Sequence, residues 1–214
     1  MTFARAPAKL AGMKLFYDIV YRFFRAPWDI GPRRELVELV ESGRIKPGRA
    51  IDLGSGTASN VIWLAQHGFD ALGIDFSAPA VEKGRRLAQT TGIQAEFILD
   101  NLTDLRTVSG TFDLLVDYGT LDDLIPADRD LYVRNVVPLA RSGSTFLLYC
   151  FEWTPRWWEE LIVRLKFLGA MALEPGEVER RFERWFEVEQ IAREVDYRKW
   201  PPGYAVYLMK RKPR

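Results

Sequence analysis

Four acidic side chains lie in, or at the end of, short apolar segments in the first part of the chain, where carboxylates can bind a ligand. They are Asp52, Asp75, Asp100 and Asp117. If the four segments are parallel strands, their carboxyl ends meet at one edge of a sheet, where open α/β sheets bind ligands. A rim of carboxylates suits a cation that carries hydroxyl and amino groups and repels a phosphate. The spacing therefore predicts a crevice for a positively charged ligand.

The rest of the chain is organised around a glycine turn at residues 50–60. Residues 50–53 predict a buried strand, Gly54 and Gly56 a tight turn, and the residues after them a helix. Glycine leaves room for a ligand against the main chain, and the start of a helix presents unpaired N–H groups. A dinucleotide-binding turn has a third glycine at its sixth position, which is Ser59 here, so a diphosphate ligand is disfavoured.

The sequence resembles the class I S-adenosylmethionine (SAM)-dependent methyltransferases over residues 27–212. Asp52-Leu53-Gly54-Ser55-Gly56 matches their first motif, and Asp75, Asp100-Asn101 and Asp117 match the acidic ends of their next three strands. The resemblance implies a Rossmann-like α/β sheet of seven strands, mostly parallel with an antiparallel last strand, and helices on both faces. It also implies SAM as the methyl donor and S-adenosylhomocysteine as the product.

The same resemblance assigns the donor-binding residues. Asp75 is expected to hold the ribose hydroxyls and Asp100 the adenine amine, and the backbone at Gly54 and Gly56 should pass close to the methionine part. The full set of cofactor-binding residues expected is Trp28, Asp52, Gly54, Gly56, Asp75, Phe76, Asp100, Asn101, Leu102 and Asp117. The family's usual third glycine is Ala58 here, which leaves the turn credible.

Trp28 belongs to a Pro27-Trp28-Asp29 segment similar to one in thiol and thiopurine methyltransferases, where it covers the cofactor. We therefore expect Trp28 to stack near the methionine part of the donor. The alternative is a tryptophan that fills the edge of the core.

Asp122 and Asp123 follow the fourth acidic strand, where the resembling family places the transferable methyl group. Methyl transfer is an in-line displacement, so the protein must align the acceptor and provide for its proton. We expect Asp122 to act as the base or to orient the acceptor, with capping of the next turn as the alternative. Tyr118 stands where some relatives have arginine, so their substrate preference does not carry over.

Two aromatic helices are predicted near the crevice. Residues 13–24 carry Tyr17 and Tyr21 on one face and can form a lid, pack on the sheet edge or lie in a membrane interface. Residues 156–173 include Trp157 and can form a substrate cap, an interfacial helix or part of the core. We expect Tyr17, Tyr21, Tyr118, Trp153 and Trp157 to contact the acceptor.

Composition excludes several other functions. The chain has 214 residues, enough for one domain with a core, and its net charge of +1 is not typical of nucleic-acid binding. Its single cysteine, Cys150, permits no internal disulfide and lies in an apolar run, so we expect a core residue and a reducing cytoplasm. One histidine and one cysteine argue against a metal site. No secretory signal or membrane-spanning run is recognised.

The predicted organisation is a lid helix and cofactor-covering segment at residues 1–32, followed by a methyltransferase domain at 33–214. This domain is expected to carry an inserted substrate-cap helix at about 154–174. Further predicted helices span residues 78–91, capped by Ser77, and 127–140, and strand five is predicted at 144–152. Residues 1–12 are expected to be mobile, with the first helix beginning at Met13.

We infer a methyltransferase that acts on a small, apolar acceptor, because the predicted lid is aromatic and the charge is near neutral. A thiol or sulfide comes first, then a nitrogen or oxygen atom of a heterocycle, phenol or fatty acid. A non-catalytic SAM-binding protein and a nicotinamide-dependent oxidoreductase remain alternatives. Asp117-Tyr118-Gly119-Thr120 does not match the corresponding motif of nucleic-acid methyltransferases. A peripheral membrane contact through the aromatic helices stays open, as does the oligomeric state.

Overall fold

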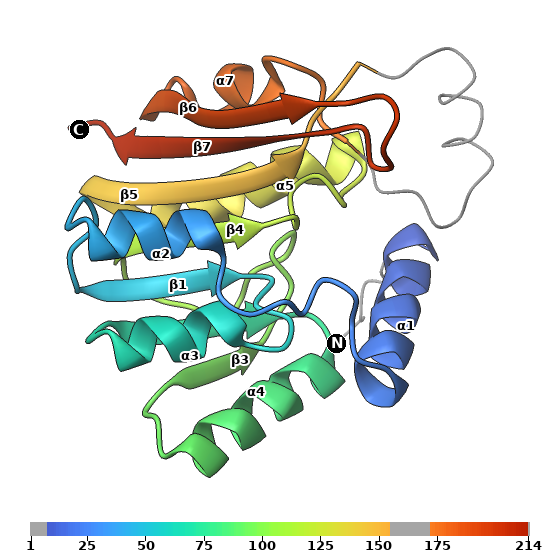
Figure 1. Cartoon of the computed structure of the whole chain (residues 1–214), viewed down its shortest axis with the longest axis vertical. Coiled ribbons are helices and arrows are strands. Elements are labelled where there is room, and N and C mark those ends of the chain that lie inside the picture. Colours follow the sequence, from blue (N-terminus) through green and yellow to red (C-terminus); the bar gives the residue numbers. More distant parts are fainter. Residues whose placement is uncertain (1–7, 155–171, 214) are drawn as a thin grey trace.

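The computed structural model describes residues 8–154 and 172–213, with side chains from residue 12 onward. Its centre is a seven-stranded sheet with the strand order β3-β2-β1-β4-β5-β7-β6 (Figure 1). Strands β1 to β5 run parallel to one another, and β7 is antiparallel to both of its neighbours. The strands are β1 Arg49–Leu53, β2 Asp70–Asp75, β3 Glu96–Leu99, β4 Phe112–Tyr118, β5 Ala140–Phe151, β6 Phe186–Val195 and β7 Gly203–Arg211. The fold predicted from the sequence is confirmed.

Helices cover both faces of the sheet (Figure 1). They are α1 Ala8–Phe23, α2 Arg34–Glu41, α3 Ser59–Gln66, α4 Ala78–Thr91, α5 Pro126–Val136, the short 3-10 helix η1 Val137–Leu139, and α7 Glu177–Phe182. Because successive strand residues point to opposite faces, Ala50 packs with α2, α3 and α4 whereas Ile51 packs with α5 and α7. Cys150 is fully buried in the second of these clusters, as predicted.

Helix α1 lies beyond the carboxyl ends of the parallel strands and beside α4 (Figure 1). It begins at Ala8, five residues before the predicted start at Met13. Ser77 occupies the N-cap position of α4 but makes no capping bond, because its Oγ donates to Asp18 Oδ1 at 2.7 Å instead. This hydrogen bond ties α1 to the end of β2.

Helix α5 is shorter than predicted, and β5 begins earlier. Pro138 has no N–H group to continue the helix, so the chain passes through η1 and enters β5 at Ala140. An irregularity in the β4–β5 pairing follows, and Ser144 stabilises it by accepting from the Arg141 N–H and donating to the Phe112 carbonyl. The predicted cap helix at about 154–174 lies mostly outside the described residues. No helix of the described part is long and apolar enough to cross a membrane.

Candidate active site

The turn after β1 requires a backbone that few residues adopt. Gly54 and Gly56 have φ angles of 78° and 50°. A Cβ atom on Gly54 would lie 2.1 Å from Thr120 Oγ1, and one on Gly56 would lie 2.9 Å from the Tyr21 hydroxyl. Ala58, which stands where the third glycine is usual, also has a positive φ of 76°. The loop is therefore held tightly against neighbouring segments from β4 and α1.

The N–H groups of this turn are already hydrogen-bonded within the protein. Those of Gly54 and Ser55 donate to the Ile74 carbonyl at 2.8 and 2.9 Å. The N–H of Gly56 donates to Asp75 Oδ2 at 2.8 Å. A diphosphate would need these donors and would be repelled by the Asp75 carboxylate. The arrangement therefore favours a cationic ligand without phosphate, as the acid spacing predicted.

Asp75 is the last residue of β2. Its Oδ1 accepts from the Ser77 N–H at 2.8 Å, and its side chain is buried. Burial raises the Asp75 pKa to about 6, although the hydrogen bonds from Ser77 and Gly56 oppose this shift. The ring of Phe76 meets that of Tyr17 edge-on at 5.8 Å between centroids. A ribose beside Asp75 would thus lie against an aromatic wall.

Asp100 holds its own loop in place. Its Oδ2 accepts from the N–H groups of Arg106 and Thr107 at 2.9 and 2.7 Å and from Thr107 Oγ1 at 2.5 Å. Burial acts to raise the Asp100 pKa, but these hydrogen bonds outweigh it and the pKa is lowered. Asn101 Oδ1 accepts from the Thr103 N–H at 3.0 Å, and Leu102 is buried. That Asp100, Asn101 and Leu102 contact adenine stays a prediction.

Asp52 and Asp117 lie on the adjacent strands β1 and β4 and are both buried. Asp117 accepts from the Thr120 and Leu121 N–H groups at 2.8 and 3.2 Å and from the Tyr132 hydroxyl at 2.5 Å. Burial raises the pKa of each carboxyl to about 7. The two side chains therefore hold protons, or attract a cation, near neutral pH.

Asp122 and Asp123 are adjacent acidic residues in the turn after β4. Asp122 is fully buried, and its Oδ2 accepts from the Phe151 N–H at 3.2 Å. Its Oδ1 is buried without a hydrogen-bond partner among the described residues. Burial and the Asp123 charge raise the Asp122 pKa well above its usual range, and burial raises that of Asp123 to about 6. A buried carboxylate oxygen without a partner can receive a proton or hydrogen bond from a ligand.

Three aromatic residues from α1 and the segment after it gather above the glycine turn. The rings of Tyr17 and Tyr21 stack at 5.9 Å, and Trp28 meets them edge-on at 5.5 and 6.1 Å. Trp28 Nε1 donates to the Tyr21 hydroxyl at 3.0 Å, and the Tyr17 hydroxyl donates to Asp123. The structure thus brings Tyr17, Tyr21 and Trp28 to the same crevice as the acidic residues.

Another predicted acceptor contact, Tyr118, packs elsewhere. Tyr118 stacks on Tyr149 at 4.7 Å, lies under the Arg33 guanidinium and donates its hydroxyl to Glu35, so it packs toward α2. Trp153 is buried, and its Nε1 has no acceptor among the described residues. Trp157 lies outside the described residues. The roles of these side chains toward an acceptor remain predictions.

A buried ion pair that the sequence analysis did not identify supports the acidic turn. Arg129 donates to both carboxylate oxygens of Glu177 at 3.1 and 3.0 Å. It also donates to the backbone carbonyls of Leu124 at 2.9 Å and Asp122 at 3.3 Å. The two residues are 48 positions apart, and a sequence offers no spacing signal for such a pair. Arg129 thereby fixes the main chain of the turn that contains Asp122.

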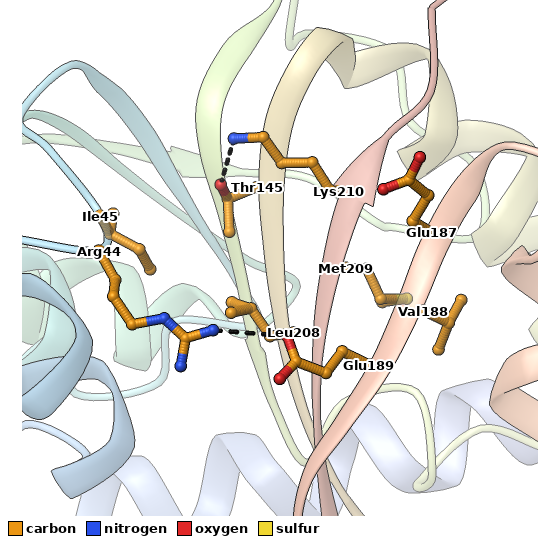
Figure 2. Close-up of a pocket in the computed structure, with 9 residues that line it drawn as sticks. All are labelled: Arg44, Ile45, Thr145, Glu187, Val188, Glu189, Leu208, Met209 and Lys210. Carbon is orange, nitrogen blue, oxygen red and sulfur yellow. Dashed lines mark hydrogen bonds and ion pairs between the residues drawn. The ribbon is translucent and has the colours of Figure 1, made fainter.

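A separate hollow lies away from the candidate site residues. A cavity of about 330 Å³ lies at the opposite end of the strands, between the turn after α2 and the β6–β7 pair (Figure 2). An Arg44–Glu189 ion pair at 3.4 Å spans it, and Lys210 bonds Thr145 at 3.3 Å on its wall (Figure 2). None of the candidate site residues lines it. Among the described residues, no group of three acidic, histidine or cysteine side chains is arranged to hold a metal ion.

Comparison with known proteins identifies the class. A family model described as a methyltransferase domain matches residues 50–143. EEF1A lysine methyltransferase 2 of Danio rerio is 32% identical over 173 residues, which are 70% of this chain and 72% of that protein. The 2-heptyl-1-hydroxyquinolin-4(1H)-one methyltransferase of Mycobacteroides abscessus is 28% identical over 131 residues. This match covers 60% of the chain and only 57% of that protein.

A solved structure shows the same fold. The Burkholderia thailandensis 1,6-didemethyltoxoflavin-N1-methyltransferase, crystallised with 1,6-didemethyltoxoflavin and S-adenosylhomocysteine, superposes with a TM-score of 0.71 at 17% identity. The superposition covers 99% of this chain and 94% of that one.

The chain belongs to the class I SAM-dependent methyltransferases, and its methyl donor is SAM. The residues present fit such a donor. The N–H groups of the turn are hydrogen-bonded within the protein, so they are not available to a phosphate. The carboxyl groups of Asp52, Asp75 and Asp117 are buried at the ends of neighbouring strands and would offer negative charge to a sulfonium cation and acceptors to ribose hydroxyls. The nicotinamide-dependent alternative is left without support, because a diphosphate would meet Asp75 rather than free N–H donors.

Proposed function

We propose that the enzyme transfers the methyl group of SAM to a small, apolar acceptor that enters between α1 and the turn after β4. The observation that carries the proposal is the Asp122 Oδ1 atom, which is buried and lacks a partner among the described residues. Asp122 is next to Asp123 in the chain, and the Tyr17 hydroxyl donates to Asp123. Tyr17 thus connects the two acidic residues to the rings of Tyr21 and Trp28. A polar atom at the edge of an aromatic surface suits an acceptor with one reacting heteroatom on an apolar body.

The donor supplies a methyl carbon activated by a sulfonium leaving group, and the protein supplies position and charge. In this proposal Asp75 binds the ribose hydroxyls and Gly54 and Gly56 let the donor approach the main chain. Asp52 and Asp117 add negative charge near the sulfonium. The rings of Tyr17, Tyr21 and Trp28 exclude water, which strengthens these interactions.

The Asp122–Asp123 pair accounts for the acceptor's proton. Two neighbouring carboxyl groups in a buried site resist carrying two negative charges at once, so in this proposal one is neutral while the other is ionised. The ionised member accepts the proton that the acceptor loses when its heteroatom bonds to the methyl carbon. A pKa raised toward neutral makes a carboxylate a better base than one with its ordinary pKa.

The acceptor class rests on two supports. The acceptor side of the crevice is aromatic, and the names of two similar proteins specify heteroaromatic acceptors, one of which carries a heptyl chain. We place a thiol or sulfide first, because a thiol ionises close to neutral pH and makes the smallest demand on a base. A nitrogen or oxygen atom of a heterocycle, phenol or fatty acid follows.

A product screen with methyl-labelled SAM tests the proposal. The purified enzyme is incubated with panels of thiols, heterocycles, phenols and fatty acids, and with a lysine-containing protein extract as a separate arm. Label transferred to a small acceptor supports the proposal. Label found only on protein lysine would contradict it and place the enzyme closer to its Danio rerio relative. SAM binding without transfer to any panel would indicate the non-catalytic alternative.

A further inference from the structure

Helix α1 exposes the apolar side chains that its own packing does not use. Leu15, Ile19 and Phe23 are 61%, 44% and 69% exposed and follow one another at four-residue spacing. They form a single stripe along the helix. Phe16 and the following Phe24 extend it and are also exposed. We call these five side chains the α1 apolar stripe.

The opposite face of α1 is fixed to the protein through polar atoms. The Tyr17 hydroxyl donates to Asp123, Ser77 Oγ donates to Asp18, and the Tyr21 hydroxyl accepts from Trp28. A surface helix normally turns its apolar side inward and its polar side to water. The same inner face also packs Tyr17, Val20 and Tyr21 against Ala80 of α4. Helix α1 therefore already has a buried apolar contact, and the α1 apolar stripe is a second apolar face that is left exposed.

Basic residues border the stripe. Arg22 and Arg25 are exposed at its carboxyl end, and Lys83 reaches it from α4, with Nζ 3.3 Å from the Phe24 carbonyl. The nearby acidic groups are engaged on the other side: Asp18 with Lys14 and Ser77, and Asp29 with Ser59. The border of the stripe is therefore positively charged.

We propose that the α1 apolar stripe docks on an anionic membrane surface. An apolar helical face bordered by arginine and lysine is the pattern that inserts into the headgroup region, and the cations attract acidic lipids. A second copy of the chain is the other candidate occupant, and sedimentation velocity detects it.

Docking in this way would set the crevice close to the bilayer. Helix α1 covers the carboxyl edge of the sheet (Figure 1), and its inner face contacts the acidic turn through Tyr17. The inference concerns the outer face of α1 alone and does not depend on which acceptor is methylated.

Vesicle flotation tests the inference. The full chain is mixed with vesicles of phosphatidylcholine alone or of phosphatidylcholine with phosphatidylglycerol. The variants are Ile19→Ser/Phe23→Ser in the stripe and Arg22→Gln/Arg25→Gln at its border, and Leu131→Ser on α5 is the matched control, since Leu131 is also exposed. Thermal unfolding of each variant, followed by circular dichroism, verifies that it is folded. Sedimentation velocity without lipid reports self-association.

We expect the wild type and Leu131→Ser to float with the anionic vesicles and to bind neutral ones at least tenfold less. Ile19→Ser/Phe23→Ser should lose at least tenfold in partitioning while remaining folded, and Arg22→Gln/Arg25→Gln should lose binding to the anionic vesicles specifically. A folded wild type that floats with neither vesicle would overturn the inference, as would unchanged flotation of the stripe variant. A wild-type dimer that the stripe variant dissociates, without vesicle binding, would assign the stripe to a second copy instead.

Discussion

The hydroxyl of Tyr17 donates a hydrogen bond to Asp123, and this contact joins residues 106 positions apart. It connects helix α1, which precedes the sheet, to the acidic turn after β4. The same tyrosine ring lies against Tyr21, Trp28 and Phe76. One side chain thus couples the aromatic covering of the crevice to the carboxyl pair that we propose handles the acceptor's proton.

Replacement of Tyr17 by phenylalanine should loosen α1 and change how Asp123 titrates. We expect SAM affinity, measured by calorimetry, to fall about tenfold, since a hydrogen bond to a charged group is lost. The Tyr17 bond opposes the rise that burial causes in the Asp123 pKa. Carboxyl NMR should therefore show Asp123 titrating at higher pH in the variant. Tyr204→Phe on β7 is the control, and an unmoved Asp123 titration would show that the bond does not tune the pair.

The variant Asp122→Asn separates catalysis from donor binding. With the best acceptor from the product screen, kcat should fall about 100-fold or more, because the amide group that replaces the carboxyl can neither exchange a proton with Asp123 nor accept a hydrogen bond from the acceptor through its nitrogen. The SAM dissociation constant should stay within about threefold, since Asn retains an oxygen for the Phe151 N–H. Asp128→Asn in the first turn of α5 serves as the control. Wild-type turnover in Asp122→Asn would make Asp122 a structural residue.

The buried carboxyl groups predict that the SAM-free protein is less stable in mild base than in mild acid. The pKa values of Asp52 and Asp117 are raised to about 7, and those of Asp75 and Asp123 to about 6. The native state therefore holds more protons than the unfolded chain in this range, and its stability falls as pH rises.

Urea unfolding at about pH 5 and about pH 8 measures this effect. The free energy of unfolding should be lower at the higher pH by roughly 1 kcal/mol or more. Asp52→Asn should flatten the dependence. A stability that stays constant or increases between the two pH values would mean that the pKa values of these carboxyl groups are not raised in the folded protein.

The Arg129–Glu177 pair should be necessary for stability. Glu177→Gln removes the charge of the carboxylate that the buried Arg129 guanidinium binds through two hydrogen bonds, and we expect a loss of about 3 kcal/mol in the free energy of urea unfolding. Glu38→Gln removes an exposed partner of Arg34 and should cost less than about 1 kcal/mol. If the free energy of unfolding falls equally little in both variants, the turn that contains Asp122 is held by other contacts.

The sequence predicted the sheet because its strands are short apolar runs that end in acid and glycine. The placement of Asp52 in β1, of Asp75 at the end of β2 and of Gly56 in the turn after β1 followed from that spacing. Helix ends were less predictable: Pro138 ends α5 early, and Ser77 gives its hydroxyl to α1 rather than to its own helix. Where a helix ends and which partner its capping residue binds depend on neighbours that come together only in the folded chain.

Within the site, the direction of individual side chains could not be predicted. Asp100 lies where expected, yet its carboxylate binds its own loop, and Tyr118 packs toward α2 through Glu35 and Tyr149. The Arg129–Glu177 pair was not found, because an arginine and a glutamate far apart in the chain are indistinguishable from surface charges in a sequence. Only burial marks them as a supporting pair.

Calorimetric titration of SAM into the wild type and into Asp75→Asn tests the central claim most directly. The claim is that a SAM cation is held between the glycine turn and the buried carboxylates, with Asp75 at the ribose. The account predicts that the wild type binds SAM, that Asp75→Asn binds it at least about 10-fold more weakly, and that Asp104→Asn on the exposed loop binds normally. Equal affinity of a folded Asp75→Asn and the wild type would contradict it.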